Sequence, residues 1–169
     1  MTKNKVLIPI DGSQFSLQVL NHVTRFLSPA ENELILLYVA EEPGVVEVEQ
    51  VGLDELTIYV DQAEASIRSS FADGMLPQVR ALEKVGFTVS TNVRFGEPID
   101  EIEKCIEAEA IDLVAMTTHG RTGLSRVMYG SVAEHVLRHA TVPVLLYRTF
   151  SEKLETNGKV SDKEAVFMV

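Results

Sequence analysis

The chain has 169 residues, a length that suits one domain with a single hydrophobic core. Apolar residues make up 46% and charged residues 24%, which excludes wholesale disorder. The formal net charge of −10 disfavours nucleic acid and anionic lipid as general partners, because such a surface repels their phosphates.

Short apolar runs alternate with helical patterns in the first part of the chain. The predicted elements are a strand at 6–10, a helix at 15–26, a strand at 34–39 and a mobile loop at 41–54. Both strands are continuous apolar runs, which is typical of strands buried on two faces. The helix has apolar residues at helical spacing, and Ser13 is its expected N-cap.

The same alternation continues to the end of the apolar pattern. The predicted elements are helices at 56–82, 98–106 and 132–140 and strands at 87–93, 113–116 and 142–147, with a glycine-rich stretch at 117–130. Gly74 and Pro77 are expected to kink or split the first of these helices, and Gly86 is expected to end it. The strand at 87–93 alternates in polarity, which predicts partial exposure.

Strands that alternate with helices predict parallel βαβ units with right-handed crossovers. The expected fold class is therefore α/β: a single-domain, open, parallel five-stranded sheet of the Rossmann-like type, with helices on both faces. We expect this domain to span residues 1–148. Residues 149–169 are expected to be a polar linker with a short apolar tail at its end.

Several features indicate a cytoplasmic protein without a membrane span. Cys105 is the only cysteine, so no internal disulfide can form, and it is expected to be a small buried group on a helix. Residues 1–5 lead directly into a short strand, without the apolar region of a secretory signal. No apolar run approaches the roughly 20 residues that a bilayer-spanning helix needs.

Two segments are predicted to lie outside the carboxyl ends of strands, where ligands bind in open parallel sheets. One is 9–13 and the other is 116–131. Gly130 and Ser131 directly precede a helix, whose first N–H groups and dipole favour a phosphate. Such a pair also caps helices that bind nothing, and Asp11 would equally suit a simple Asx turn. No G-x-x-x-x-G-K-[ST] is present, which excludes a Walker-type NTPase.

Two widely separated motifs in these segments match one known family. The matching residues are Pro9, Asp11 and Ser13 in an opening Pro-x-Asp-x-Ser, and Gly120, Gly130 and Ser131 in a later glycine motif. With them, the span 5–148 resembles the universal stress protein family, whose ATP-binding members carry G-x2-G-x9-G-[ST]. The first glycine of that motif falls at Thr117, where a Cβ would crowd a nucleotide and a hydroxyl could donate to a phosphate.

The resemblance implies an adenine nucleotide alpha hydrolase-like fold with a site for ATP, or for AMP or ADP, together with Mg²⁺. It places Asp11 at the ribose hydroxyls, the Val39 backbone at the adenine, and the glycine motif around the phosphates. The implied binding residues are Pro9, Asp11, Val39, Met116, Thr117, His119, Gly120, Arg121, Gly130, Ser131 and Val132.

The function that the resemblance implies is a nucleotide-dependent regulator in the stress response. It also implies a homodimer through antiparallel pairing of the strand 142–147, and Pro143 independently suits a sheet edge. Two alternatives stay open: an interaction protein of the same fold that binds no nucleotide, which Thr117 supports, and a slow ATPase. We assign no catalytic residue, and we assign no metal site because His135 and His139 lack an evident third ligand.

Overall fold

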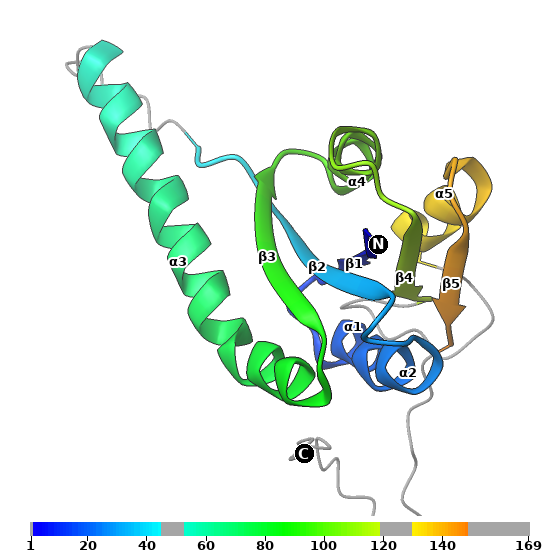
Figure 1. The fold of residues 1–169 in the computed structure, drawn as a ribbon. Helices are drawn as coiled ribbons and strands as arrows, with labels where there is room; N and C mark the ends of the chain where they lie inside the picture. Colours follow the sequence, from blue (N-terminus) through cyan, green and yellow to red (C-terminus); the bar gives the residue numbers. More distant parts are fainter. Residues whose placement is uncertain (1, 45–52, 119–129, 149–169) are drawn as a thin grey trace, which may run out of the picture.

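The computed structural model describes residues 2–44, 53–118 and 130–148 of the chain. Its elements are β1 (Asn4–Pro9), α1 (Gln14–Leu17), α2 (Val19–Phe26), β2 (Asn32–Ala40), α3 (Leu53–Val85), β3 (Thr88–Phe95), α4 (Pro98–Ala108), β4 (Leu113–Thr117), α5 (Ser131–His139) and β5 (Val144–Tyr147). The strands form one five-stranded parallel sheet in the order β3-β2-β1-β4-β5 (Figure 1). The predicted α/β fold class is confirmed.

Helices cover both faces of this sheet. Val6 and Ile8 of β1 pack in a core shared with α2 and α3, whereas Leu7 packs in a second core shared with α4 and α5. Successive side chains of a strand point to opposite faces, so one apolar run supplies both cores. All three side chains are completely buried, as the continuous apolar run predicted.

The strand order creates a crevice at the carboxyl ends of the central strands of the sheet. From β1 the chain moves outward through β2 to β3, and it then returns to the other side of β1 to form β4 and β5. The helices that follow β1 and β4 cover opposite faces, because α2 contributes to the first core and α5 to the second. Connections that leave neighbouring strands toward opposite faces open a crevice at the carboxyl ends of those strands.

The helix predicted at 15–26 is divided into α1 and α2 at Gln18. Ser13 is the N-cap of α1, as predicted: its hydroxyl oxygen accepts a hydrogen bond from the Ser16 N–H at 3.1 Å. Gln18 keeps helical backbone angles, and its N–H donates to the Phe15 carbonyl oxygen three residues earlier. The division is therefore a local tightening of the hydrogen-bond pattern and not a turn.

Gly74 and Pro77 are predicted to kink or split the long helix, and only the split is wrong, because α3 is one helix of 33 residues. Pro77 lacks an N–H and leaves one carbonyl of the preceding turn without its helical donor. Met75 and Leu82 on either side are buried in the first core, so packing on the sheet outweighs the local preference. The helix bends toward its carboxyl-terminal end (Figure 1).

The ends of the elements differ from the predictions by a few residues. α3 begins at Leu53, so the predicted loop 41–54 is two residues too long, and its residues 45–52 lie outside the described ones. Gly86 follows the last residue of α3, as predicted, with a φ of +108°. β5 begins only after Pro143, whose carbonyl oxygen accepts from the Val114 N–H. In the described part of the chain, no helix has the combined length and apolarity that crossing a membrane requires.

The two glycines of this region give a matched test of the helix assignment. Gly74 lies inside α3, and a Cβ added there would meet no atom within 4 Å, whereas Gly86 has a positive φ that disfavours any side chain. We expect Gly74→Ala to raise the free energy of unfolding by about 0.5–1 kcal/mol. Gly86→Ala should lower it by about 1–2 kcal/mol. Urea denaturation measures both, and a loss of stability in Gly74→Ala would contradict a continuous helix at that position.

Candidate functional site

A pocket of about 250 Å³ opens at the carboxyl ends of β1, β2 and β4, in the crevice that the strand order creates. The first turns of α4 and α5 form two of its walls. Its lining consists of Pro9, Ile10, Asp11, Ser16, Leu37, Val39, Pro98, Ile102, Met116, Thr117, Thr118, Gly130, Ser131, Val132 and Ala133.

Every predicted binding residue that lies within the described residues lines this pocket. These residues are Pro9, Asp11, Val39, Met116, Thr117, Gly130, Ser131 and Val132. The other three predicted residues, His119, Gly120 and Arg121, lie outside the described residues. Two motifs that are far apart in the sequence are thus brought to one pocket by the pairing of β1 with β4.

Asp11 is held at the pocket by the turn that follows β1. Its Oδ1 accepts hydrogen bonds from the Ser13 N–H at 3.0 Å and from the Ser13 hydroxyl at 2.6 Å. Gly12 between them has a φ of +80°, which glycine adopts without strain. Asp11 therefore forms the Asx turn that was its simpler interpretation, and this turn also fixes the carboxylate where it lines the pocket.

The start of α5 supplies polar groups of the opposite kind. The Gly130 N–H donates to the Thr118 carbonyl oxygen at 2.7 Å, and the Gly130 carbonyl oxygen accepts from the Glu134 N–H at 2.9 Å. In an α-helix each N–H donates to the carbonyl four residues earlier, and for residues 131–133 that carbonyl lies before the start of α5. These three N–H groups therefore have no acceptor within the helix. They carry the positive end of the helix dipole, so this wall can hold an anion. The Gly130 amide itself is engaged within the protein.

The wall formed by α4 was not predicted. Pro98 lies in the first turn of α4, and Ile102 lies one turn later with 2% of its surface exposed. Both line the pocket. The available signal was topological: a helix that follows a parallel strand begins at the same sheet edge as the predicted site. The other lining residues that sequence reasoning missed are Ile10, Ser16, Leu37, Thr118 and Ala133.

The chemistry of the pocket is asymmetric. Among the described lining residues, Asp11 is the only ionisable side chain, and its carboxylate lies at the end of β1. The floor is largely apolar, with Leu37, Val39 and Met116 from the strands. A ligand that fits has an apolar body for this floor, hydroxyl groups for the carboxylate, and an anionic group for the first turn of α5.

The other candidate groups from the sequence have partners away from this pocket. His135 Nε2 lies 2.8 Å from Glu103 Oε1, and the ring of His139 stacks on His135 at 4.2 Å. Within the described ranges, no three His, Cys, Asp or Glu side chains gather as a metal site would require. Cys105 is completely buried, as predicted, and burial raises the pKa of its thiol, although the nearby Arg94 acts in the opposite direction.

The fold agrees with comparisons to known proteins. Residues 3–148 match the model of the universal stress protein family. The universal stress protein MJ0577 of Methanocaldococcus jannaschii is 30% identical over 152 residues, which cover 85% of this chain and 94% of that relative. A solved structure of MJ0577 superposes with a TM-score of 0.70 at 29% identity, covering 89% of this chain and 99% of that one.

Two further solved structures share the fold at lower identity. One is a universal stress protein family protein of Arabidopsis thaliana with AMP bound, with a TM-score of 0.60, 14% identity, and coverage of 91% of this chain and 97% of that one. The other is a universal stress protein in complex with cAMP, with a TM-score of 0.53, 19% identity, and coverage of 88% and 98%. From the match over residues 3–148, this chain belongs to the universal stress protein family.

Proposed function

We propose that this protein binds an adenine nucleotide, ATP or its relatives AMP and ADP, in the pocket described above and acts as a nucleotide-dependent regulator in the stress response. One observation carries the proposal. An oriented carboxylate and the first turn of a helix line the same apolar pocket, at Asp11 and at residues 131–133. These groups suit the ribose and the phosphates of one ligand, with the adenine against the floor near Val39.

The acidic character of the protein makes this local arrangement necessary. A net charge of −10 repels a polyphosphate at long range, so attraction must come from donors that touch it. The amides of residues 131–133 are such donors, and we expect Gly120 and Arg121 to add to them. Mg²⁺ would arrive bound to the polyphosphate, because it prefers phosphate oxygens and water with few protein carboxylates.

Known proteins of the same fold support the class of ligand. The Arabidopsis thaliana structure holds AMP and another family structure is a complex with cAMP, so both partners are adenylates. A regulatory role fits better than rapid catalysis, because Asp11 is the one ionisable group in the described lining. Its carboxylate is committed to the turn with Ser13. Fast phosphoryl transfer would need a further positioned group near the γ-phosphate.

A second candidate function is an interaction protein of this fold without a nucleotide. Thr117 favours it, because its side chain is 6% exposed and lies at the pocket where the family motif has glycine. Heat denaturation of the freshly purified protein distinguishes the two functions. Adenylate in the supernatant supports nucleotide binding.

Replacing Gly130 separates binding from folding. Gly130 has a φ of −59° and a ψ of 148°, which aspartate adopts freely, and aspartate is a better helix N-cap than glycine. An added Cβ would lie 3.4 Å from the Thr118 carbonyl oxygen, at contact distance. We expect Gly130→Asp to fold with unchanged or higher stability and to lose nucleotide binding, because its carboxylate repels the phosphates.

Calorimetric titration with Mg·ATP, ADP and AMP measures this effect, and Gly130→Ala is the control for size without charge. The control should bind more tightly than Gly130→Asp. Wild-type protein that releases no heat with any adenylate would contradict nucleotide binding. A Gly130→Asp variant that binds as well as wild type would contradict the placement of the phosphates.

The role of Asp11 is tested on the ligand as well as on the protein. We expect Asp11→Asn to weaken AMP binding by about tenfold, the size of a lost hydrogen bond to a charged group. The same variant should bind 2′,3′-dideoxy-AMP as weakly as wild type does, because that ligand has no ribose hydroxyl to donate. Equal losses for both ligands would show that Asp11 acts only through the turn with Ser13.

We also propose a homodimer through β5. This strand is at the edge of the sheet, and its inner side faces β4, because the Pro143 and Tyr147 carbonyl oxygens accept from β4 and the residue after it. By alternation, the Leu146 N–H points to the outer side, where a second β5 could pair with it. Leu146→Pro removes that donor and should shift the sedimentation coefficient from dimer to monomer, with the fold checked by circular dichroism. A wild-type monomer at micromolar concentration would contradict this proposal.

A further inference from the structure

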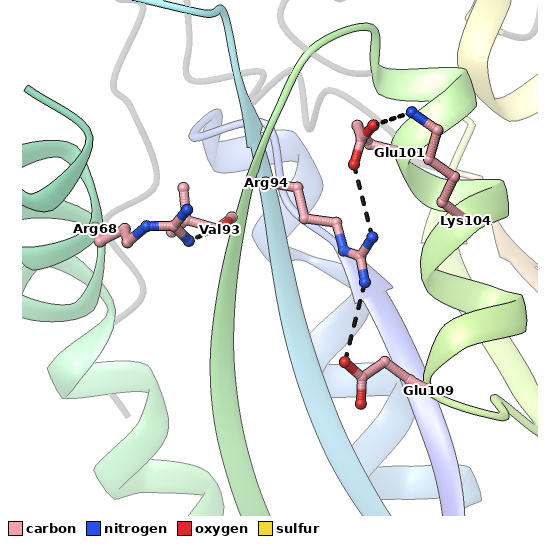
Figure 2. A network of polar contacts seen from close by, with 6 residues as sticks. All are labelled: Arg68, Val93, Arg94, Glu101, Lys104 and Glu109. Atoms are coloured by element: carbon pink, nitrogen blue, oxygen red, sulfur yellow. Dashed lines mark hydrogen bonds and ion pairs between the residues drawn. The ribbon is translucent and has the colours of Figure 1, made fainter. Parts of the chain in front are cut away.

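A network of ion pairs joins the edge strand β3 to α4 (Figure 2). Arg94 of β3 reaches across to two carboxylates, one on α4 and one on its C-cap residue: Nη1 lies 3.6 Å from Glu101 Oε2, and Nη2 lies 3.9 Å from Glu109 Oε1. Glu101 also accepts a hydrogen bond from Lys104 Nζ at 2.6 Å. One guanidinium group therefore holds two points of α4 that are two helical turns apart.

The centre of this network, the pair Arg94 and Glu101, is poorly accessible to water, whereas Glu109 and Lys104 at its ends are 41% and 64% exposed. The side chain of Arg94 is 20% exposed and that of Glu101 is 12% exposed. The Arg94 Nε is buried and has no hydrogen-bond partner among the described residues. Charges with little hydration depend strongly on their partners, so displacement of α4 from β3 would be costly. The position of Arg94 thereby constrains the position of the helix.

The network lies beside the candidate site. Arg94 is paired in register with Val39 on the neighbouring strand β2, and such partners point to the same face of a sheet. Val39 lines the pocket. On α4, Glu101 lies between Pro98 and Ile102, which line the opposite wall. Arg94 thus connects the strand next to the pocket floor with the helical turn that forms the wall.

We propose that Arg94 is a positioning residue for the nucleotide pocket: by holding the first turns of α4 against β3, it sets the separation between Val39 and Ile102. The inference rests on the proposed function, and it concerns the end of the pocket where the adenine would lie. A ligand that packs against Ile102 stabilises the docked helix, and the docked helix in turn raises the affinity for that ligand.

A matched control lies on the other face of the same strand. Arg68 of α3 donates a hydrogen bond to the Val93 carbonyl oxygen (Figure 2). Its guanidinium lies 4.8 Å from the centre of the Phe95 ring. Arg68 also pairs with Glu64 at 3.3 Å. It joins a helix to β3 as Arg94 does, but its helix, α3, contributes no residue to the described lining of the pocket, whereas α4 contributes Pro98 and Ile102. Arg68→Met therefore replaces the same side chain by the same residue, but at a position where we expect no effect on the pocket.

The chain carries its own probe for the position of α4. Cys105 lies on α4 one turn from Glu101 and one turn from Glu109, it is completely buried, and it is the only cysteine in the sequence. A thiol reagent such as Ellman's reagent can modify it only when the helix opens locally. The rate of modification thus reports undocking of α4, whether or not a nucleotide is bound. Because Arg94 also acts directly on the pKa of this thiol, Arg94→Lys, which keeps a cation in place, is the control for that direct effect.

The experiment measures ATP affinity and Cys105 modification in wild type, Arg94→Met, Arg94→Lys and Arg68→Met, well below the melting temperature of each. We expect Arg94→Met to bind ATP about tenfold more weakly and to react about tenfold faster at Cys105, an effect typical of interacting charged neighbours. Arg94→Lys, which keeps the charge, should recover part of both losses. Arg68→Met should leave both within about twofold of wild type, because it acts on the other face. Saturating ATP should slow Cys105 modification in wild type.

The outcomes separate this inference from the proposed function. Wild type that binds no adenylate overturns the proposed function and with it the role of Arg94 in the pocket. Wild type that binds ATP, together with Arg94→Met that binds equally well, overturns the inference alone. Equal losses in Arg94→Met and Arg68→Met would show a general effect on stability and would also overturn it. If Arg94→Met does not fold, Arg94→Lys and the effect of ATP on wild-type Cys105 decide the question.

Discussion

The hydrogen bond from the Gly130 N–H to the Thr118 carbonyl oxygen, at 2.7 Å, is the contact on which the candidate site depends. It fixes the start of α5 against the end of β4, beside the turn in which Asp11 is held. The amide and the carbonyl of Gly130 are both hydrogen-bonded within the protein. The groups that could donate to an anion are therefore the N–H groups of the next three residues of the chain. The pocket lies in the crevice at the carboxyl ends of the strands, and this hydrogen bond fixes the position of the α5 wall of that pocket.

Two electrostatic effects, one at long range and one on contact, act on an anion that approaches this protein. The exterior carries a net charge of −10, which repels anions at a distance, whereas the pocket presents backbone dipoles that attract them on contact. Some side-chain charges hold elements together, as Arg94 does with Glu101 and Glu109. On the proposed function, this division would let an acidic protein bind phosphate at a pocket whose described lining contains no basic side chain.

Much of the fold and part of the site follow from local sequence. Continuous apolar runs identified the strands, and the motif residues Asp11 and Gly130 both line the pocket at the carboxyl ends of the strands. The continuity of α3 did not follow, because Met75 and Leu82 stabilise the helix around Pro77 only once the sheet is formed. The α4 wall did not follow either, since contacts between segments distant in sequence leave no local pattern. The family resemblance added what backbone contacts cannot reveal, such as the role expected for Val39.

The most direct test follows the backbone amides of the first turn of α5 by ¹⁵N NMR during titration with Mg·ATP. We expect the resonances of Ser131, Val132 and Ala133 to shift strongly and saturate together, with slower hydrogen exchange in the bound state, because these N–H groups gain phosphate oxygens as acceptors. Saturable binding of ATP that leaves these three amides unchanged would place the phosphates elsewhere and contradict the central claim.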